Sequence, residues 1–294
     1  MILSPNLKGA LLMMGSMAAF TFNDACVKLV SAELPLFQIV FFRGILTTLL
    51  IAALAWAMGL RSLRIPRGDI ALVAGRTAAE IASMCAFLYA LTHMPLANVS
   101  SILAAMPLSV TLAGALLLGE PVGWRRLVAI LVGFTGVLMI VKPGAEGFNV
   151  SSLAALLAVL LVTARDLFTR RMSAHVPSMA IAVITALSVG LFGGVAMLWQ
   201  GWAPVTMREG GLIAGAAVFI VGGYLFSIMV MRVGEIGFVA PFRYTALIWA
   251  LLLGWLVFGD WPSWLTLAGA SIVVITGIFT LYRERMMRKP VAAR

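Results

Sequence analysis

Residues 95–118 read Pro-Leu-Ala-Asn-Val-Ser-Ser-Ile-Leu-Ala-Ala-Met-Pro-Leu-Ser-Val-Thr-Leu-Ala-Gly-Ala-Leu-Leu-Leu, a predominantly apolar stretch without a charged residue. At about 1.5 Å per residue, a helix of this length crosses the ~30 Å hydrocarbon core of a bilayer. Similar stretches recur along all 294 residues, of which 62% are hydrophobic and 11% are charged. Because soluble domains carry about 25% charged residues, the composition predicts an integral membrane protein.

The predicted fold class is all-α, because lipid offers the backbone no hydrogen-bond partners and helices satisfy their own. Pro, Gly and charged residues separate the apolar stretches, and the connections between them are short. We predict ten transmembrane helices, with boundaries uncertain by a few residues. They are residues 9–30, 35–58, 69–91, 95–118, 124–141, 151–172, 177–199, 209–231, 235–258 and 263–282.

Basic residues between the apolar stretches predict the orientation. If the N-terminus is cytoplasmic, the cytoplasmic loops and tails hold most of the 21 Lys and Arg residues, and the outer loops hold only Lys142 and Arg208. The positive-inside rule then favours a multi-pass protein of the bacterial inner membrane with both termini cytoplasmic. Nucleic-acid binding is not expected, because the net charge of +10 is spread over loops rather than gathered in one basic domain.

Polar residues repeat along the chain at a nearly constant offset. Residues 24–35 and 166–177 share an Asp, a base four residues later, a Ser-Ala pair and a final Pro. The offset of about 140 residues spans five predicted helices, and an odd number makes the second copy enter the membrane inverted. We therefore predict two inverted five-helix repeats, one in residues 1–145 and one, with a short basic cytoplasmic tail, in residues 146–294.

Three motifs give the chain a family resemblance. Leu-Leu-Leu-Gly-Glu at 116–120 precedes a Gly-rich fifth helix, and Phe-Gly-Asp at 258–260 precedes an equally Gly-rich tenth helix. Phe-Phe-Arg-Gly at 41–44 lies in the second helix. With these motifs and the repeat, nearly the whole chain resembles the EamA-type ten-helix members of the drug/metabolite transporter superfamily.

The resemblance implies a secondary transporter that moves a small organic metabolite, amino-acid-like or cofactor-like, by alternating access. Helices one to four and six to nine would enclose the central site, while helices five and ten would be structural. The Asn23-Asp24 and Lys28 pattern resembles uptake carriers for riboflavin or S-adenosylmethionine, which is the alternative to a metabolite exporter. One chain supplies both halves, so a monomer is expected to suffice, and proton coupling stays open.

Sequence motifs for catalysis are absent. The chain has no phosphate loop of the Gly-x-x-x-x-Gly-Lys type, no His-Glu-x-x-His and no Gly-x-Ser-x-Gly. Its His, Cys and acidic residues do not have metal-site spacing. We therefore expect no catalytic residue, metal or cofactor, and a membrane-embedded enzyme or a channel is the non-transporter alternative.

Charged side chains inside the predicted helices are the candidate functional residues. A charge at the bilayer centre costs at least ~2.5 kcal/mol, so such residues should face a partner or a water-filled path. The candidates for substrate binding or coupling, with one neighbouring tyrosine, are Asp24, Arg43, Arg76, Glu80, Arg165, Asp166, Arg243 and Tyr244.

Two of these acids have a base four residues later, a spacing that brings side chains together on a helix. Asp24 and Lys28 would meet near the outer face, and Asp166 and Arg170 near the cytoplasmic face. Lys28 and Arg170 are therefore gate candidates. The competing interpretation is that both bases are interfacial anchors that reach the headgroups.

The other charged candidates leave more than one interpretation open. Arg76 and Glu80 are also four residues apart, and Glu80 could complete a structural bridge, carry a coupling proton or contact substrate. Arg43 and Arg243 could each pair with an acid on a neighbouring helix or bind a substrate carboxylate or phosphate. Tyr244, which follows Arg243, could stack on an aromatic ligand.

Prolines and glycines inside the helices predict local geometry. Pro107 and Pro241 remove backbone donors within the fourth and ninth helices, so kinks that line the central cavity are expected. Small residues let membrane helices approach closely. The four-residue glycine spacings that begin at Gly190 and Gly211 are therefore interpreted as helix-packing sites.

Overall fold

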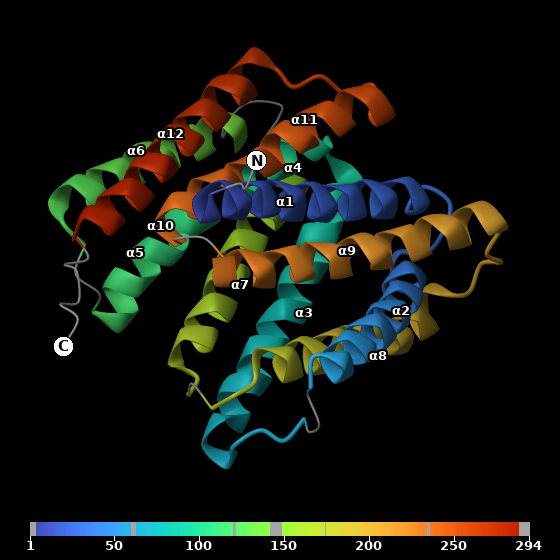
Figure 1. The fold of residues 1–294 in the computed structure, drawn as a ribbon. Helices are drawn as coiled ribbons and strands as arrows, with labels where there is room; N and C mark the ends of the chain where they lie inside the picture. The colour runs from blue at the N-terminus through green and yellow to red at the C-terminus, as the bar shows by residue number, and fades with distance from the viewer. Residues whose placement is uncertain are drawn as a thin grey trace.

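The computed structural model describes residues 4–59, 63–119, 122–141, 149–173, 175–233 and 236–287. Within them, 10 helical segments are long and apolar enough to cross a membrane, and no strand is present. The predicted all-α membrane fold is therefore confirmed (Figure 1). The predicted repeat boundary at 145–146 and the basic tail from residue 288 lie outside the described residues.

Each predicted transmembrane segment corresponds to one helix or to consecutive helices of the structure. The first half contains α1 (Pro5–Val30), α2 (Leu36–Ala57), η1 (Arg67–Asp69), α3 (Ile70–His93), α4 (Leu96–Leu103), α5 (Met106–Leu118) and α6 (Trp124–Val141). The second half contains α7 (Val150–Arg171), α8 (Ser178–Gln200), α9 (Met207–Val233), α10 (Ile236–Val239), η2 (Ala240–Tyr244), α11 (Thr245–Phe258) and α12 (Trp264–Met287).

Gly119 and Gly259 end α5 and α11 in the same way. Their φ angles are 66° and 69°, in the left-handed region that glycine adopts without a Cβ penalty. The two glycines that the offset of 140 residues relates therefore have the same structural role. The acid that follows Gly119 in the sequence motif, Glu120, lies outside the described residues.

The fourth and ninth transmembrane segments are broken rather than smoothly kinked. α4 ends at Leu103 and α5 begins at Met106, which places Pro107 in the first helical turn, where its missing N–H is not needed. Pro241 lies in η2, between α10 and α11. Since α4 packs against α11, both broken segments are neighbours, an arrangement common around the substrate sites of transporters.

Most of the closest helix pairs join one helix of the first half to one helix of the second half. α1 lies beside α9, α3 beside α7, α2 beside α8 and α6 beside α12 (Figure 1). The pairs α1–α9 and α3–α7 each join the first helix of one half to the third helix of the other. The pairs α2–α8 and α6–α12 join equivalent helices. An inverted repeat predicts this pattern of contacts.

Gly44 and Gly190 bring the backbones of α2 and α8 into contact. A Cβ atom on Gly44 would lie 2.5 Å from the Cα atom of Gly190, so a larger residue does not fit there. This crossing fixes the position of Arg43, the preceding residue. The packing role expected for Gly211 and Gly215 is wrong, because an added Cβ atom at either position meets nothing within 4 Å.

Helices α6 and α12 form a close pair at one side of the bundle (Figure 1). A Cβ atom on Gly136 would lie 2.7 Å from the carbonyl oxygen of Gly269. The glycines of the fifth and tenth transmembrane segments thus allow direct backbone contact, which supports the structural role expected for these two segments.

Candidate functional site

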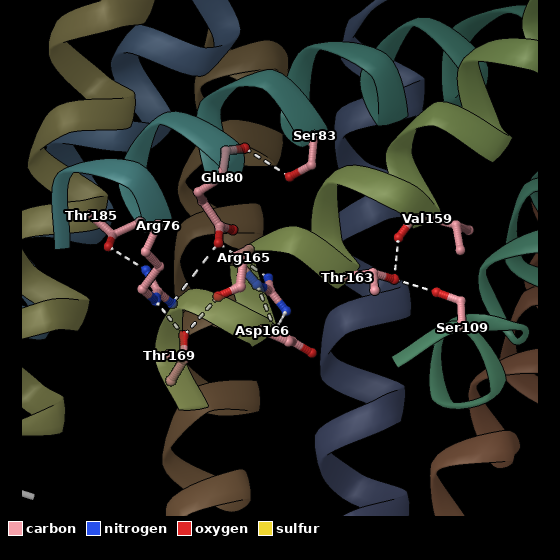
Figure 2. A network of polar contacts seen from close by, with 10 residues as sticks. All are labelled: Arg76, Glu80, Ser83, Ser109, Val159, Thr163, Arg165, Asp166, Thr169 and Thr185. Carbon is pink, nitrogen blue, oxygen red and sulfur yellow. Dashed lines mark hydrogen bonds and ion pairs between the residues drawn. The ribbon is translucent and has the colours of Figure 1, made fainter. Parts of the chain in front are cut away.

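Two arginines and two acids form a cluster between α3 and α7 (Figure 2). Arg165 Nη1 lies 3.1 Å from Glu80 Oε2, and Arg165 Nη2 lies 2.8 Å from Asp166 Oδ1. Arg76 precedes Glu80 by one turn of α3, and its Nη2 atom is 3.9 Å from Glu80 Oε2. The two positive and two negative charges compensate each other, as charges within a membrane segment require.

Two threonine hydroxyls accept hydrogen bonds from the cluster. Arg76 donates hydrogen bonds to Thr169 Oγ1 of α7 at 3.2 Å and to Thr185 Oγ1 of α8 at 2.7 Å. Thr169 in turn donates to the carbonyl oxygen of Arg165 at 3.0 Å. Arg76 therefore ties α3 to both α7 and α8, a role that the sequence analysis did not assign to either threonine.

The side chains of the α3–α7 cluster are partly exposed. The exposed fractions of its side chains are 17% for Arg76, 19% for Glu80, 25% for Arg165 and 37% for Asp166. Ionisable residues that keep such access within a transmembrane segment typically border a water-filled path.

A second polar group joins α1 and α2. Arg43 Nη1 donates to Asn23 Oδ1 at 3.0 Å, and Asn23 Nδ2 donates to Asp24 Oδ1 at 2.9 Å. In this Asn23 group, Asn23 and Arg43 are buried, at 3% and 9% exposed, and Asp24 is half-buried. The pairing expected between Arg43 and Asp24 is therefore indirect, because the amide of Asn23 lies between the two charges.

The α3–α7 cluster and the Asn23 group occupy related positions in the two halves. Both lie at the contact of the first helix of a half with its neighbours. At an offset of 142 residues, the related pairs are Asn23 and Arg165, Asp24 and Asp166, and Arg43 and Thr185.

Tyr224 of α9 lies between these two polar groups. Its ring packs edge-to-face on Phe20 of α1 at a centroid distance of 5.4 Å, and the residue is 38% exposed. It interacts electrostatically with Arg43 of the Asn23 group and with Glu80 and Arg165 of the α3–α7 cluster. Sequence reasoning missed Tyr224, because it has no charged neighbour in its helix and no polar counterpart in the repeat.

Lys28 does not contact Asp24. Its Nζ atom donates to the carbonyl oxygen of Met94 at 2.5 Å and lies 5.2 Å from the ring centroid of Phe258. Within the described residues Asp24 and Lys28 form no ion pair, so the expected contact between them is wrong. The long Lys28 side chain reaches past its own helix to the connection between α3 and α4 and to the end of α11.

The second pair of this spacing also differs from expectation. The ion pair of Asp166 is formed with the adjacent Arg165, at 2.8 Å. In the part of the chain that the structure describes, Asp166 forms no ion pair with Arg170. Arg170 lies in the last turn of α7, at the end of the helix where a gate was expected.

Arg243 and Tyr244 belong to neither polar group. Arg243 is exposed in η2. Tyr244 is 8% exposed, and its hydroxyl lies where a Cβ atom on Gly277 of α12 would be. Gly277 thus makes room for the phenol, and Tyr244 packs between helices. The substrate-stacking role of Tyr244 stays a prediction, and in this structure the ring is packed between helices.

Two contacts join helix ends at opposite sides of the bundle. After α7, Ser173 donates through its backbone N and its Oγ atom to the carboxylate of Asp69, before α3, at 3.0 Å and 2.6 Å. After α1, Glu33 accepts a hydrogen bond from Arg208, at the start of α9, at 2.6 Å. Figure 1 shows the first pair of helix ends at the lower left and the second at the right.

We name these contacts the Asp69–Ser173 latch and the Glu33–Arg208 latch. Each joins the end of the first helix of one half to the start of the third helix of the other half. Sequence reasoning missed both. The available signal was the offset of 140 residues between Asp69 and Glu209, the residue next to Arg208.

Comparison with known proteins agrees with this geometry. The EamA-like transporter family matches residues 7–142 and again residues 150–283. The pseudopaline exporter CntI of Pseudomonas aeruginosa is 32% identical over 270 residues, which cover 89% of this chain and 92% of that protein. The riboflavin transporter of Vibrio cholerae is 28% identical, with coverages of 93% and 92%.

A further relative and a solved structure extend the likeness. The S-adenosylmethionine uptake transporter of Rickettsia conorii is 23% identical over 92% of this chain and 91% of its own. A crystal structure with 17% identity superposes with a TM-score of 0.67 over 95% of this chain and 98% of its own, which supports the fold. The protein is therefore a multi-pass membrane protein that belongs to the EamA-like transporter family.

Proposed function

We propose that this protein is a secondary transporter that carries an amino-acid-like or cofactor-like metabolite across the bacterial inner membrane by alternating access. The observation that carries the proposal is the pair of polar groups at related positions of the two halves, with Tyr224 between them. Charged residues are too costly in hydrocarbon to be kept without a partner or a polar path. Two such groups facing one residue support a central substrate site.

The difference in exposure between the two groups supports alternating access. The side chains of the α3–α7 cluster are partly exposed, whereas Asn23 and Arg43 are buried, and we propose that access alternates between the two groups. In the opposite conformation, we expect the Asn23 group to become accessible. The Asp69–Ser173 and Glu33–Arg208 latches, with Lys28 and Arg170 close to them in sequence, are the proposed gate elements.

Glu80 is proposed to be a structural ion-pair partner rather than a carrier of coupling protons. Its carboxylate lies between the guanidinium groups of Arg165 at 3.1 Å and Arg76 at 3.9 Å. If transport is proton-coupled, the pH dependence should therefore survive in Glu80→Gln. A shifted or abolished pH profile in that variant would assign the proton to Glu80.

The substrate proposal draws on the relatives, which are named for export of pseudopaline and for uptake of S-adenosylmethionine and riboflavin. Purified protein in proteoliposomes, loaded with unlabelled compound, should exchange labelled S-adenosylmethionine, riboflavin or an amino acid in a saturable manner. Running the assay with the gradient in either direction separates import from export. Arg165→Gln should abolish exchange, and empty liposomes provide the background.

The same assay separates the transporter from the other candidate functions. A channel would give flux without saturation or competition between related compounds. A membrane-embedded enzyme would convert the added compound into a new product, which mass spectrometry of the vesicle contents would detect. Either result would replace the proposed transport function.

The inverted arrangement of the two halves is proposed together with cytoplasmic termini and a functional monomer. Single cysteines at residues 120 and 260, in a protein with Cys26 and Cys85 replaced by alanine, should be labelled by an impermeant maleimide from opposite sides of the membrane. Labelling of both from one side would contradict the inverted repeat. Transport that scales linearly with protein at one monomer per vesicle would support a functional monomer.

A further inference from the structure

Arg43 differs from the two arginines of the α3–α7 cluster in having no carboxylate partner. Arg76 and Arg165 both lie within ion-pair distance of Glu80. Arg43 is more deeply buried, at 9% exposed, and donates a hydrogen bond to the neutral amide of Asn23. Among the described residues no carboxylate oxygen lies within 4.0 Å of its guanidinium group.

The guanidinium group of Arg43 therefore has donors to spare. An arginine carries five N–H donors in a planar fork, and one of the Arg43 nitrogens is engaged by Asn23 Oδ1. Asn23 also donates a hydrogen bond to Asp24. The carboxylate of Asp24 therefore partly compensates the positive charge of Arg43 without contacting its guanidinium group. By contrast, both terminal nitrogens of Arg165, in the second half, contact carboxylates, one of Glu80 and one of Asp166.

A second donor faces the same region from another helix. Tyr224 interacts electrostatically with Arg43, and α9, which carries Tyr224, packs against both α1 and α2. Tyr224 is 38% exposed, so its side chain is not sealed between helices. The guanidinium group of Arg43 and the phenol of Tyr224, on the packed helices α2 and α9, are thus close enough to interact electrostatically.

We propose that Arg43 and Tyr224 bind the carboxylate group of the transported metabolite, an inference that rests on the transport function proposed above. A carboxylate can accept two parallel hydrogen bonds from a guanidinium fork, and the Tyr224 hydroxyl supplies a third donor. A single negative charge fits the site better than a phosphate dianion, because Asp24 already lies one hydrogen bond from Arg43. The substrate class is therefore a metabolite with a free carboxylate, such as an α-amino acid or its conjugate.

The test compares ligands that differ only in the carboxylate. The common α-amino acids are paired with their carboxamides, and S-adenosylmethionine is paired with its decarboxylated form. Binding to purified wild-type protein is measured by calorimetry and by thermal stabilisation. We expect at least one carboxylate to bind about 10-fold or more tightly than its partner, as the loss of charge-assisted hydrogen bonds predicts.

Variants then locate the effect. Arg43→Gln should abolish the preference for the carboxylate member while leaving binding of the neutral member unchanged. Arg43→Lys, which keeps the charge but not the fork, should retain part of the preference. Tyr224→Phe keeps the ring on Phe20 and should weaken carboxylate binding by about 3-fold or more. Arg125→Gln, which removes an exposed arginine at the start of α6, is the matched control.

Several outcomes would overturn the proposal. They are equal binding of both members of every pair, no binding of any carboxylate, or a preference that persists in both Arg43→Gln and Tyr224→Phe. Because Arg43→Gln could disturb folding, the milder Tyr224→Phe keeps the test decisive, and the melting temperature of each variant is recorded. Carboxylate binding that depends on Arg43, without flux in proteoliposomes, would instead count against the proposed transport function.

Discussion

The Asn23 group and the α3–α7 cluster use related positions of the two halves in opposite ways. In the first half the acid of the first helix is joined to an amide, and the base is Arg43 on the second helix. In the second half the acid is joined directly to Arg165, and the second helix contributes the hydroxyl of Thr185. The base has thus changed helices between the halves.

The consequence is a difference in how far each cation is neutralised. Arg165 and Arg76 share Glu80 and Asp166 in a charge-balanced network. Arg43, by contrast, is separated from Asp24 by the amide of Asn23. A repeat protein can therefore keep one copy of a polar site for structural cohesion and release the other for a ligand.

Glu80→Gln should have the largest effect on stability. The substitution leaves Arg76 and Arg165 with Asp166 as their one acid, and we expect the free energy of unfolding to fall by about 2–3 kcal/mol. This is less than the full cost of breaking a buried ion pair, because the side chains are partly exposed. Chemical unfolding in detergent micelles measures it. The double variant Glu80→Gln/Arg76→Gln restores charge balance and should recover part of the loss. A loss no larger than that of Glu33→Gln would refute the charge-balance argument.

Gly44→Val should separate α2 from α8, which together carry Arg43 and Thr185. The added side chain meets the backbone of Gly190, and overpacking of this kind costs about 2 kcal/mol. The matched control is Gly215→Val, where an added Cβ atom meets nothing within 4 Å and only helix propensity changes. Equal destabilisation of the two variants would show that the crossing does not constrain the two polar groups.

Exchanging the side chains of the first group for those of the second gives the most direct comparison. Asn23→Arg alone adds an unbalanced cation and Arg43→Thr alone leaves Asp24 without a base, and each should cost about 1–2 kcal/mol. The double variant Asn23→Arg/Arg43→Thr reproduces the arrangement of the second half. It should be more stable than the sum of the single effects by about 1 kcal/mol. Additive losses would mean that the two positions are not equivalent.

The smallest effects are expected at the latches. Glu33→Gln removes an exposed ion pair, with side chains 65% and 43% exposed, and should cost less than about 1 kcal/mol. Asp69→Asn loses an acceptor of the two hydrogen bonds from Ser173 and should cost more. It should also speed maleimide labelling of a cysteine placed at Thr169, near the Asp69–Ser173 latch. Labelling that Glu33→Gln accelerates instead would contradict the gating role proposed for the Asp69–Ser173 latch.

The sequence predicted most of the residues that form the two polar groups, but not which of them contact each other. The cost of burying charge selected six residues that lie in the two polar groups, namely Asp24, Arg43, Arg76, Glu80, Arg165 and Asp166. It also selected Lys28 and Arg243, which lie in neither group. The four-residue spacing predicted the contact of Arg76 with Glu80 and wrongly predicted contacts within the other two pairs. Side chains four residues apart share a helix face, but a partner on a neighbouring helix can be closer.

The sequence by itself determined the number of helices, their limits, the repeat and the presence of charge inside the membrane. These follow from properties of short segments, namely apolar length, turn-forming residues and the cost of burying charge, and each can be evaluated locally. Only the tertiary structure decided that Arg165 pairs with Glu80, that Arg43 is left with an amide, and that Tyr224 stands between them. Those partnerships depend on which helices pack together and at what rotation, and that is set by contacts between residues on different helices, 20 positions apart for Asn23 and Arg43 and 85 for Glu80 and Arg165.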